Sequence, residues 1–95
     1  MSVLNLIGNT PLIPLYFKEE DKRILAKCEF LNPSGSIKDR IAKHVITKAI
    51  ETGDLRPGMT ILECSSGNTG IAMSMVGAAC GYPVHIVMSE HASIE

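Results

Sequence analysis

Lys38 is the residue of this sequence that is best placed to act as a nucleophile. Apolar residues recur every three or four positions over residues 37–52, which predicts an amphipathic helix with Lys38 in its first turn. The positive end of the helix macrodipole, together with any burial, disfavours the ammonium ion at that position. A neutral lysine amine can form a Schiff base with an aldehyde or a carbonyl group. Most lysines are solvated surface residues, however, and without other evidence that interpretation is favoured here, with Asp39 and Arg40 pairing on the helix surface.

A second group of polar residues lies between Cys64 and Gly70, in a segment that should join a strand to a helix. Hydroxyl groups, backbone N–H groups freed by glycine and a helix N-terminus can all face one point there, which is how proteins hold anions. The segment lacks the Gly-Lys-Ser/Thr ending of a phosphate-binding P-loop. A ligand site and an ordinary tight turn capped by Thr69 fit it about equally well. The candidate ligand residues are Ser65, Ser66, Gly67, Asn68 and Thr69.

The elements that position the lysine and the loop follow from the pattern of apolar and turn residues. The helix over residues 37–52 should have Ser36 as its N-cap and Gly53 as its C-terminal cap. Residues 60–64, 69–80 and 84–88 then read as a buried strand, a helix and a second strand. These three elements form a βαβ unit, for which we expect a parallel sheet covered on both faces. The predicted fold class is α/β.

Two further segments need an assignment. Residues 11–15 and 24–29 are short strand candidates on either side of a charged turn at residues 18–22, so a hairpin or a neighbouring pair is expected. Residues 71–88 are long and apolar enough to raise a transmembrane helix as an alternative. Gly77 interrupts that run, and Gly81-Tyr82-Pro83 is typical of a helix end followed by a turn. We therefore divide the run into a helix and a strand.

Composition limits the kinds of partner that this chain can have. With 95 residues, of which 45% are hydrophobic and 20% charged, we expect one compact globular domain rather than a disordered segment. The chain has nine Lys and Arg residues and ten Asp and Glu residues, so its net charge gives no electrostatic basis for binding nucleic acid or a membrane surface. Small molecules are therefore the favoured partners. Three cysteines without a Cys-x-x-Cys pair, and no charged-then-apolar leader, predict a reduced, cytoplasmic protein. No metal site is predicted, because the histidines and cysteines lack metal-ligand spacing.

Three separate motifs resemble those of one enzyme family. In chain order they are Ile7-Gly8-Asn9-Thr10-Pro11-Leu12, Asn32-Pro33-Ser34-Gly35-Ser36-Ile37-Lys38-Asp39-Arg40 and Ser65-Ser66-Gly67-Asn68-Thr69-Gly70. Together they closely resemble the cysteine synthase (O-acetylserine sulfhydrylase) and cystathionine β-synthase family, which consists of pyridoxal 5′-phosphate enzymes of fold type II. The resemblance runs from Leu6 to the last residue.

The resemblance implies specific roles. Lys38 would form a Schiff base with pyridoxal 5′-phosphate and would then remove the substrate α-proton, and Asn68 would contact the cofactor ring oxygen. The residues assigned to substrate binding, chiefly of its α-carboxylate, are Ser65, Ser66, Gly67, Asn68 and Thr69. The cofactor phosphate would bind a later glycine-rich loop, beyond this chain, rather than the loop at residues 65–69. The implied partners are an amino-acid substrate and sulfide or another thiol, with a homodimer as the full-length enzyme.

By the same resemblance, the chain is the N-terminal portion of a longer enzyme of two α/β domains. Residues 1–34 would hold strands that pack with the large domain, and residues 35–95 would form part of the smaller domain, which closes over the substrate. The chain stops just after a helix-start signal at Ser93, which agrees with an unfinished domain. The isolated chain should therefore be inactive.

The sequence departs from the family at two positions, where Cys64 and Ser65 replace the usual proline and threonine. Serine keeps the hydroxyl group, so carboxylate binding should survive, while the substrate preference becomes less defined. Cys64 is interpreted as a small buried residue in preference to a thiol near the cofactor.

The favoured activity is β-replacement by a cysteine synthase, in which sulfide displaces acetate from O-acetylserine. The alternatives are a serine-using cystathionine β-synthase, a β-eliminating cysteine lyase and a non-catalytic α/β module that binds carboxylates.

Overall fold

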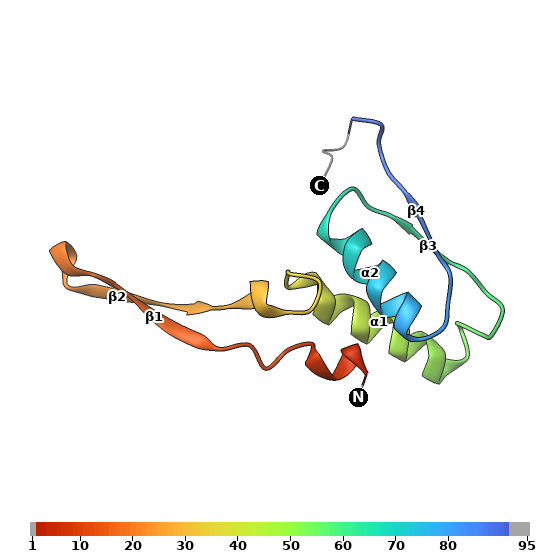
Figure 1. Ribbon diagram of the computed structural model, residues 1–95, viewed down its shortest axis with the longest axis horizontal. Coiled ribbons are helices and arrows are strands. Elements are labelled where there is room, and N and C mark those ends of the chain that lie inside the picture. Colours follow the sequence, from red (N-terminus) through yellow and green to blue (C-terminus); the bar gives the residue numbers. More distant parts are fainter. Residues whose placement is uncertain (1, 92–95) are drawn as a thin grey trace.

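The computed structural model describes residues 2–91, which form a projecting β-hairpin and an α/β body (Figure 1). The hairpin makes the molecule long and narrow, with extents of 57 × 35 × 21 Å. A short 3₁₀ helix, η1 (Val3–Leu6), packs against the body near the N-terminus. The predicted helix start at Ser93 lies outside the described residues.

The hairpin consists of β1 (Leu12–Phe17) and β2 (Lys22–Lys27), which pair antiparallel from Leu12 opposite Lys27 to Phe17 opposite Lys22. The 3₁₀ turn η2 (Lys18–Glu20) connects them, and Asp21 completes the turn in the left-handed conformation at φ 47°. The predicted hairpin is confirmed, but its strand ends are displaced by about two residues because Lys22 already belongs to the ladder. The structure therefore places Glu29 in a second 3₁₀ turn, η3 (Glu29–Leu31), rather than in the strand.

Both predicted helices are present. Helix α1 (Lys38–Thr52) ends as expected, because Gly53 adopts a left-handed conformation at φ 82° and its N–H bonds to the carbonyl of Ile50. Its start differs by one residue from the prediction, since Ile37 is the N-cap. The Ser36 hydroxyl nevertheless accepts a hydrogen bond of 3.2 Å from the Lys38 N–H, which satisfies one donor of the first turn.

The C-terminal half is the predicted βαβ unit. Strand β3 (Ile61–Cys64) and strand β4 (Val84–Val87) pair in parallel, and helix α2 (Asn68–Ala79) connects them. After α2, Gly81 has φ 84° and the Tyr82 N–H bonds to the Gly77 carbonyl at 2.9 Å, which turns the chain back toward the sheet. The division of the apolar run is confirmed, and none of the helices within residues 2–91 has the length and apolarity to cross a membrane.

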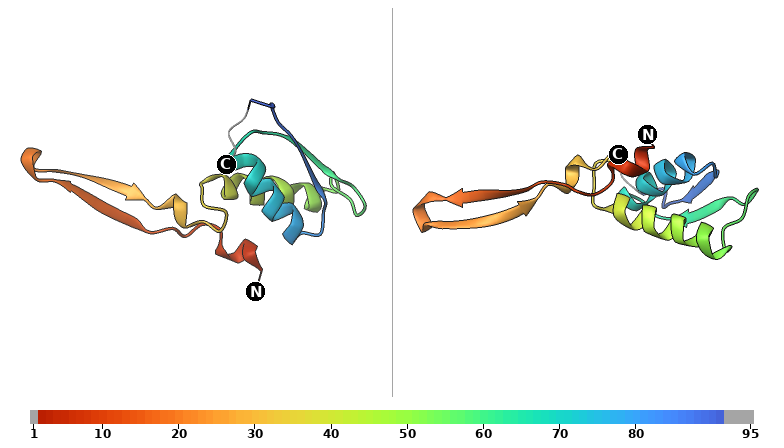
Figure 2. Two further views of the ribbon diagram at one scale, coloured as in Figure 1. Left: turned by 45° about the horizontal axis from the view of Figure 1, so that its top comes forward. Right: turned by 90° about the horizontal axis from the view of Figure 1, so that it is seen from below.

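The core lies between the two helices, which pack against each other (Figure 2). Its buried members are all apolar, and two of them are alanines, whose small side chains let the helices approach closely. They are Ala42, Ile46, Ala72, Met73 and Val76. Helix α2 also packs against both strands, and this contact depends on Gly77, where an added Cβ would lie 2.3 Å from Cγ2 of Val84.

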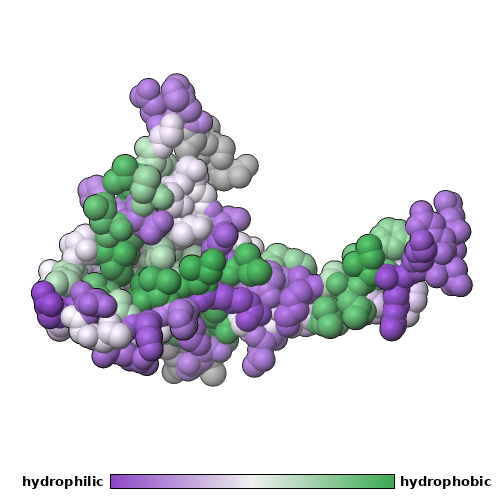
Figure 3. Space-filling model, turned by 180° about the vertical axis from the view of Figure 1, so that it is seen from behind, coloured by the Kyte–Doolittle hydropathy of each residue, from purple (hydrophilic) through white to green (hydrophobic). Residues whose placement is uncertain are grey.

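The expectation of a sheet buried on both faces is wrong for the described residues. Half-buried and exposed positions alternate along β3 and β4, and the Leu62 side chain remains 69% exposed. The reason is that α2 covers one face of this two-stranded sheet, which leaves the other face open. Hydrophobic side chains are also exposed along the hairpin (Figure 3).

Candidate active site

Lys38 is the first residue of α1, and its side chain is half-buried. Within residues 2–91 its amine makes no hydrogen bond or ion pair. Two other lysines provide the contrast, because the Lys27 amine donates to the Thr10 carbonyl and the Lys43 amine donates to the Leu4 carbonyl. The predicted nucleophile is thus partly shielded from water, and no side chain or backbone group of residues 2–91 binds its amine.

Asp39, the next residue, is completely buried and holds the segment before α1. Its carboxylate accepts hydrogen bonds from the backbone N–H of Ser34, at 2.8 Å, and from the Ser34 hydroxyl. A carboxylate in the first turn of a helix is also favoured by the macrodipole. The interpretation of Asp39 as a surface residue is wrong, because the loop that precedes α1 folds over its side chain.

Arg40 is held by Glu29 on the turn after β2. Its Nε and Nη2 atoms donate to the two carboxylate oxygens, each at 2.9 Å. The Thr10 hydroxyl donates to the same carboxylate at 2.8 Å and accepts from Arg40 Nη2 at 3.2 Å. The Arg40 guanidinium, followed by the Thr10 hydroxyl, lowers the pKa of Glu29 from 4.5 to about 2, and the carboxylate in turn raises the pKa of Arg40.

Asn32 connects this ion pair to the N-terminal segment. Its side chain is 3% exposed and donates to the Glu29 carboxylate at 2.6 Å, while its oxygen accepts from the Gly8 N–H at 2.8 Å. Gly8 has φ +86°, a conformation that L side chains rarely adopt, and a Cβ there would lie 3.2 Å from Arg40 Nη1. The first two sequence motifs are therefore joined in space.

The loop before α2 carries the other predicted site residues. The Ser65 hydroxyl accepts from the backbone N–H groups of Gly70, at 3.0 Å, and Gly67, at 3.4 Å. Gly67 is the N-cap of α2, so the alternative in which Thr69 caps the helix is wrong, and Ser65 satisfies donors of the first turn instead. Among the described residues, the side chains of Ser66, Asn68 and Thr69 make no hydrogen bond. Ser66 and Asn68 are exposed, and Thr69 is half-buried.

The two groups of predicted site residues lie at one end of the body. Helices α1 and α2 pack against each other, and all views show their N-terminal ends on the side that faces the hairpin (Figures 1 and 2). Lys38 begins α1, and the loop at residues 65–69 leads into α2. The structure therefore brings to the same end of the helix pair a lysine amine and a set of hydroxyl and amide groups that have no partner among the described residues.

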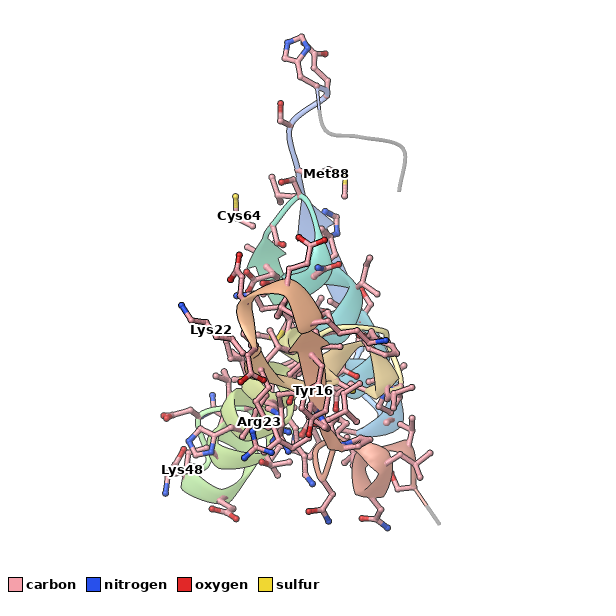
Figure 4. The ribbon with its side chains drawn as sticks, turned by 90° about the vertical axis from the view of Figure 1, so that its left-hand side faces the viewer. Tyr16, Lys22, Arg23, Lys48, Cys64 and Met88 are labelled. Carbon is pink, nitrogen blue, oxygen red and sulfur yellow. The ribbon has the colours of Figure 1, made fainter. Side chains whose placement is uncertain are left out.

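Cys64 is the last residue of β3 and lies next to this loop. Its thiol is free and exposed, and Figure 4 shows it pointing outward in the upper part of the view, where Met88 also lies. The interpretation of Cys64 as buried is wrong, because its side chain belongs to the face of β3 that α2 does not cover. No group of His, Cys, Asp or Glu side chains in residues 2–91 is arranged to hold a metal ion.

Sequence reasoning from the residues singled out Lys38 and the loop but missed the cluster around Glu29. Thr10 and Asn32 belong to the first and second family motifs, and this membership was the one sequence signal that could have pointed to them. Glu29 had little local signal, because two of its three side-chain partners, Thr10 and Arg40, lie 19 residues before it and 11 residues after it.

The described residues thus combine, at one end of the α/β unit, a half-buried lysine amine that could form a Schiff base and a polar loop at a helix start that could bind a small anion. Residues 3–95 match the family model described as pyridoxal-phosphate dependent enzyme. The chain belongs to this family. The predicted fold class and cofactor are thereby confirmed, since the structural relatives are fold-type II enzymes that use pyridoxal phosphate.

Three relatives show how similar the chain is to known proteins. It is 50% identical over 97 residues to a cystathionine beta-synthase of Apis mellifera, covering 98% of this chain and 19% of that protein. It is 46% identical to an O-ureido-L-serine synthase of Streptomyces lavendulae, covering 99% of this chain and 29% of the relative. The crystal structure of a cysteine synthase from Entamoeba histolytica superposes with a TM-score of 0.90 at 44% identity, covering 97% of this chain and 29% of that one. The chain thus spans less than a third of each relative.

Proposed function

We propose that this chain is the N-terminal part of a β-replacement enzyme, most simply a cysteine synthase, in which Lys38 binds pyridoxal 5′-phosphate. The single observation that carries the proposal is the half-buried Lys38 amine, which has no protein partner within residues 2–91 and begins α1 at the same end of the helix pair as the loop at residues 65–69. A structural lysine at this depth would be expected to find an acceptor, as the half-buried Lys43 does.

The described residues fit this cofactor at the point where it would join the protein. Lys38 supplies the amine, and Asn68 supplies an exposed amide for the ring oxygen. When bound, pyridoxal phosphate acts as an electron sink at the substrate α-carbon. Lys38 would hold the cofactor through its Nζ atom. Once Nζ is released from the cofactor, the same atom would accept the substrate α-proton.

The loop at residues 65–69 fits an α-carboxylate. Ser66 and Thr69 carry hydroxyl groups that are not used inside the described chain, and the start of α2 adds a favourable dipole. Ser65 has a different part, because its hydroxyl oxygen caps two backbone N–H groups while its proton remains available to a ligand. Gly67, as the N-cap, allows this tight turn.

O-Acetylserine and sulfide are the proposed substrates, and cysteine and acetate the products. The observation that favours a second candidate is the 50% identity to a cystathionine beta-synthase, which would make serine the amino-acid substrate. A β-eliminating cysteine lyase and a non-catalytic carboxylate-binding module are the remaining alternatives.

We also propose that the boundary between the large and the small domain of the parent enzyme lies between residues 34 and 35. The apolar face of the hairpin supports it, because Ile13, Leu15 and Ile24 remain exposed and a two-stranded ribbon is marginal in water unless another layer covers it. Residues 1–34 would then join the large domain and residues 35–95 the small one. A cytoplasmic homodimer without nucleic-acid or membrane partners completes the proposal.

The test uses the full-length protein that carries this chain. After incubation with pyridoxal 5′-phosphate and reduction with borohydride, peptide mapping should place the pyridoxyl group on Lys38. Lys43→Arg is the matched control, since Lys43 lies on the same helix and should leave labelling unchanged, whereas Lys38→Arg should abolish it. A label on another lysine would overturn the proposal, and no label at all would favour the binding module.

The substrate is tested separately on the same protein. Cysteine formation from O-acetylserine and sulfide is expected to exceed the product of serine with a thiol. The isolated 95-residue chain should show no turnover and should lose its yellow colour on dialysis, because the phosphate site is expected outside it. Turnover by the isolated chain would contradict this expectation.

A further inference from the structure

Four residues form a partly buried polar cluster that the proposed reaction does not use. We call Thr10, Glu29, Asn32 and Arg40 the Glu29 cluster. They come from the N-terminal segment, from the turn after β2 and from the first turn of α1. The cluster is therefore the point at which three segments that are distant in sequence are tied together.

The Glu29 carboxylate at its centre is fully engaged. One oxygen accepts from Thr10 Oγ1 and Arg40 Nη2, and the other accepts from Arg40 Nε and Asn32 Nδ2. Four donors match the capacity of an ionised carboxylate, so Glu29 has no lone pair left for a substrate or a proton. This arrangement suits a structural anchor, and it excludes Glu29 as a general base in this geometry.

The anchor acts on the start of α1. Local contacts there come from the Ser36 hydroxyl, which accepts from the Lys38 N–H, and from Ser34, which donates to Asp39, while the N-cap Ile37 makes no side-chain capping bond. The contact of Arg40 with Glu29 adds the tertiary restraint that fixes this turn relative to the N-terminal segment. Asp39 is held to Ser34 and Arg40 to Glu29, while the Lys38 amine before them has no partner within residues 2–91.

We propose that the Glu29 cluster positions Lys38 for Schiff-base formation by clamping the first turn of α1 to the Gly8–Thr10 segment. This inference rests on the proposed function of Lys38. Thr10, Glu29 and Arg40 are positioning residues, since none of them is placed against the cofactor or substrate. Reactions between oriented groups are sensitive to small displacements, and about 1 Å of misplacement can cost up to about a hundredfold in rate.

The test compares variants of the full-length apoprotein. Thr10→Val keeps the shape of the side chain and removes both hydroxyl contacts, whereas Thr10→Ser retains the hydroxyl. Arg40→Lys keeps the charge but loses the two-pronged contact with Glu29. Ile46→Val is the control, because it weakens the core between α1 and α2 without touching the cluster.

The first measurement is the rate of Schiff-base formation after pyridoxal 5′-phosphate is added, followed by visible absorbance. Thr10→Val and Arg40→Lys should slow it about tenfold, and Thr10→Ser should restore it to within about twofold of wild type. Ile46→Val should react at the wild-type rate although its melting temperature falls. The second measurement is hydrogen exchange of the Arg40 N–H, which bonds to the Ile37 carbonyl and should lose protection in Thr10→Val.

Two results would overturn the inference. One is a wild-type rate of Schiff-base formation in Thr10→Val and Arg40→Lys. The other is an equally slow rate in Ile46→Val, which would show that the slowing follows from a general loss of stability. Failure of the proposed function is distinguishable from both, because the wild-type protein would then show no adduct on Lys38. That outcome overturns the positioning role as well.

Discussion

Gly77 should be the position of α2 that is most sensitive to an added methyl group. It is buried in the helix, faces the sheet and would bring a Cβ to within 2.3 Å of Val84 Cγ2 and 3.3 Å of Ile61 Cδ1. Carbon atoms in contact lie about 3.5–4.0 Å apart, so Val84 would have to move by more than an ångström. Val84 is β-branched and stiff about χ1, and its backbone is held in the β4 ladder.

The magnitude follows from two opposing effects in Gly77→Ala. Alanine in place of glycine in a helix interior is worth about 1 kcal/mol in helix propensity. Overpacking a filled site costs about 1–3 kcal/mol, and a contact this short places the cost near the upper end. We therefore expect a net loss of about 1–2 kcal/mol in the free energy of unfolding of the chain.

Urea unfolding of the chain followed by circular dichroism measures this loss. Gly70→Ala is the matched control, because it lies in the same helix and its added Cβ would meet neighbours only at 3.5 Å, an ordinary contact. It should be neutral or stabilising by up to about 1 kcal/mol. The double variant Gly77→Ala/Val84→Ala should recover part of the loss, since it removes the clashing methyl group. A Gly77→Ala chain as stable as wild type would refute the reasoning.

Two further predictions concern the polar residues. Because the pKa of Glu29 is lowered from 4.5 to about 2, its stabilising contribution is complete above pH 4.5 and disappears as the pH falls toward 2. The measurement is the unfolding midpoint as a function of pH. Between pH 4.5 and 2 the midpoint of the Glu29→Gln variant should fall less steeply than that of wild type. The same pH dependence in both proteins would contradict the ion pair. Ser66→Ala and Thr69→Ala should each weaken substrate binding to the full-length holoenzyme by about 1.5–3 kcal/mol while leaving cofactor affinity nearly constant. Equal substrate titrations in variants and wild type would count against the carboxylate site.

Local patterns in the sequence determined the secondary structure and the candidate chemistry. The apolar spacing and Gly53 define α1, and Gly81-Tyr82-Pro83 separates α2 from β4, because these signals act between residues within one or two turns of each other. The hydroxyl-rich segment at residues 65–69 and the helix-start position of Lys38 are visible for the same reason. The predicted ends of the strands were less accurate. Lys22, for example, belongs to β2 because it pairs with Phe17 on β1, and local sequence does not show this pairing.

Tertiary structure alone decided how those candidates are supported. Asp39 is buried because the Ser34 loop folds over it, and Cys64 is exposed because α2 covers only the opposite face of β3. Glu29 gains its role chiefly from Thr10 and Arg40, which contact it only after the N-terminal segment and the start of α1 have met the turn after β2. Such contacts depend on the path of the whole chain, which periodicity does not encode. The sequence thus identifies the amine and the polar loop, and the fold determines what holds the amine in place.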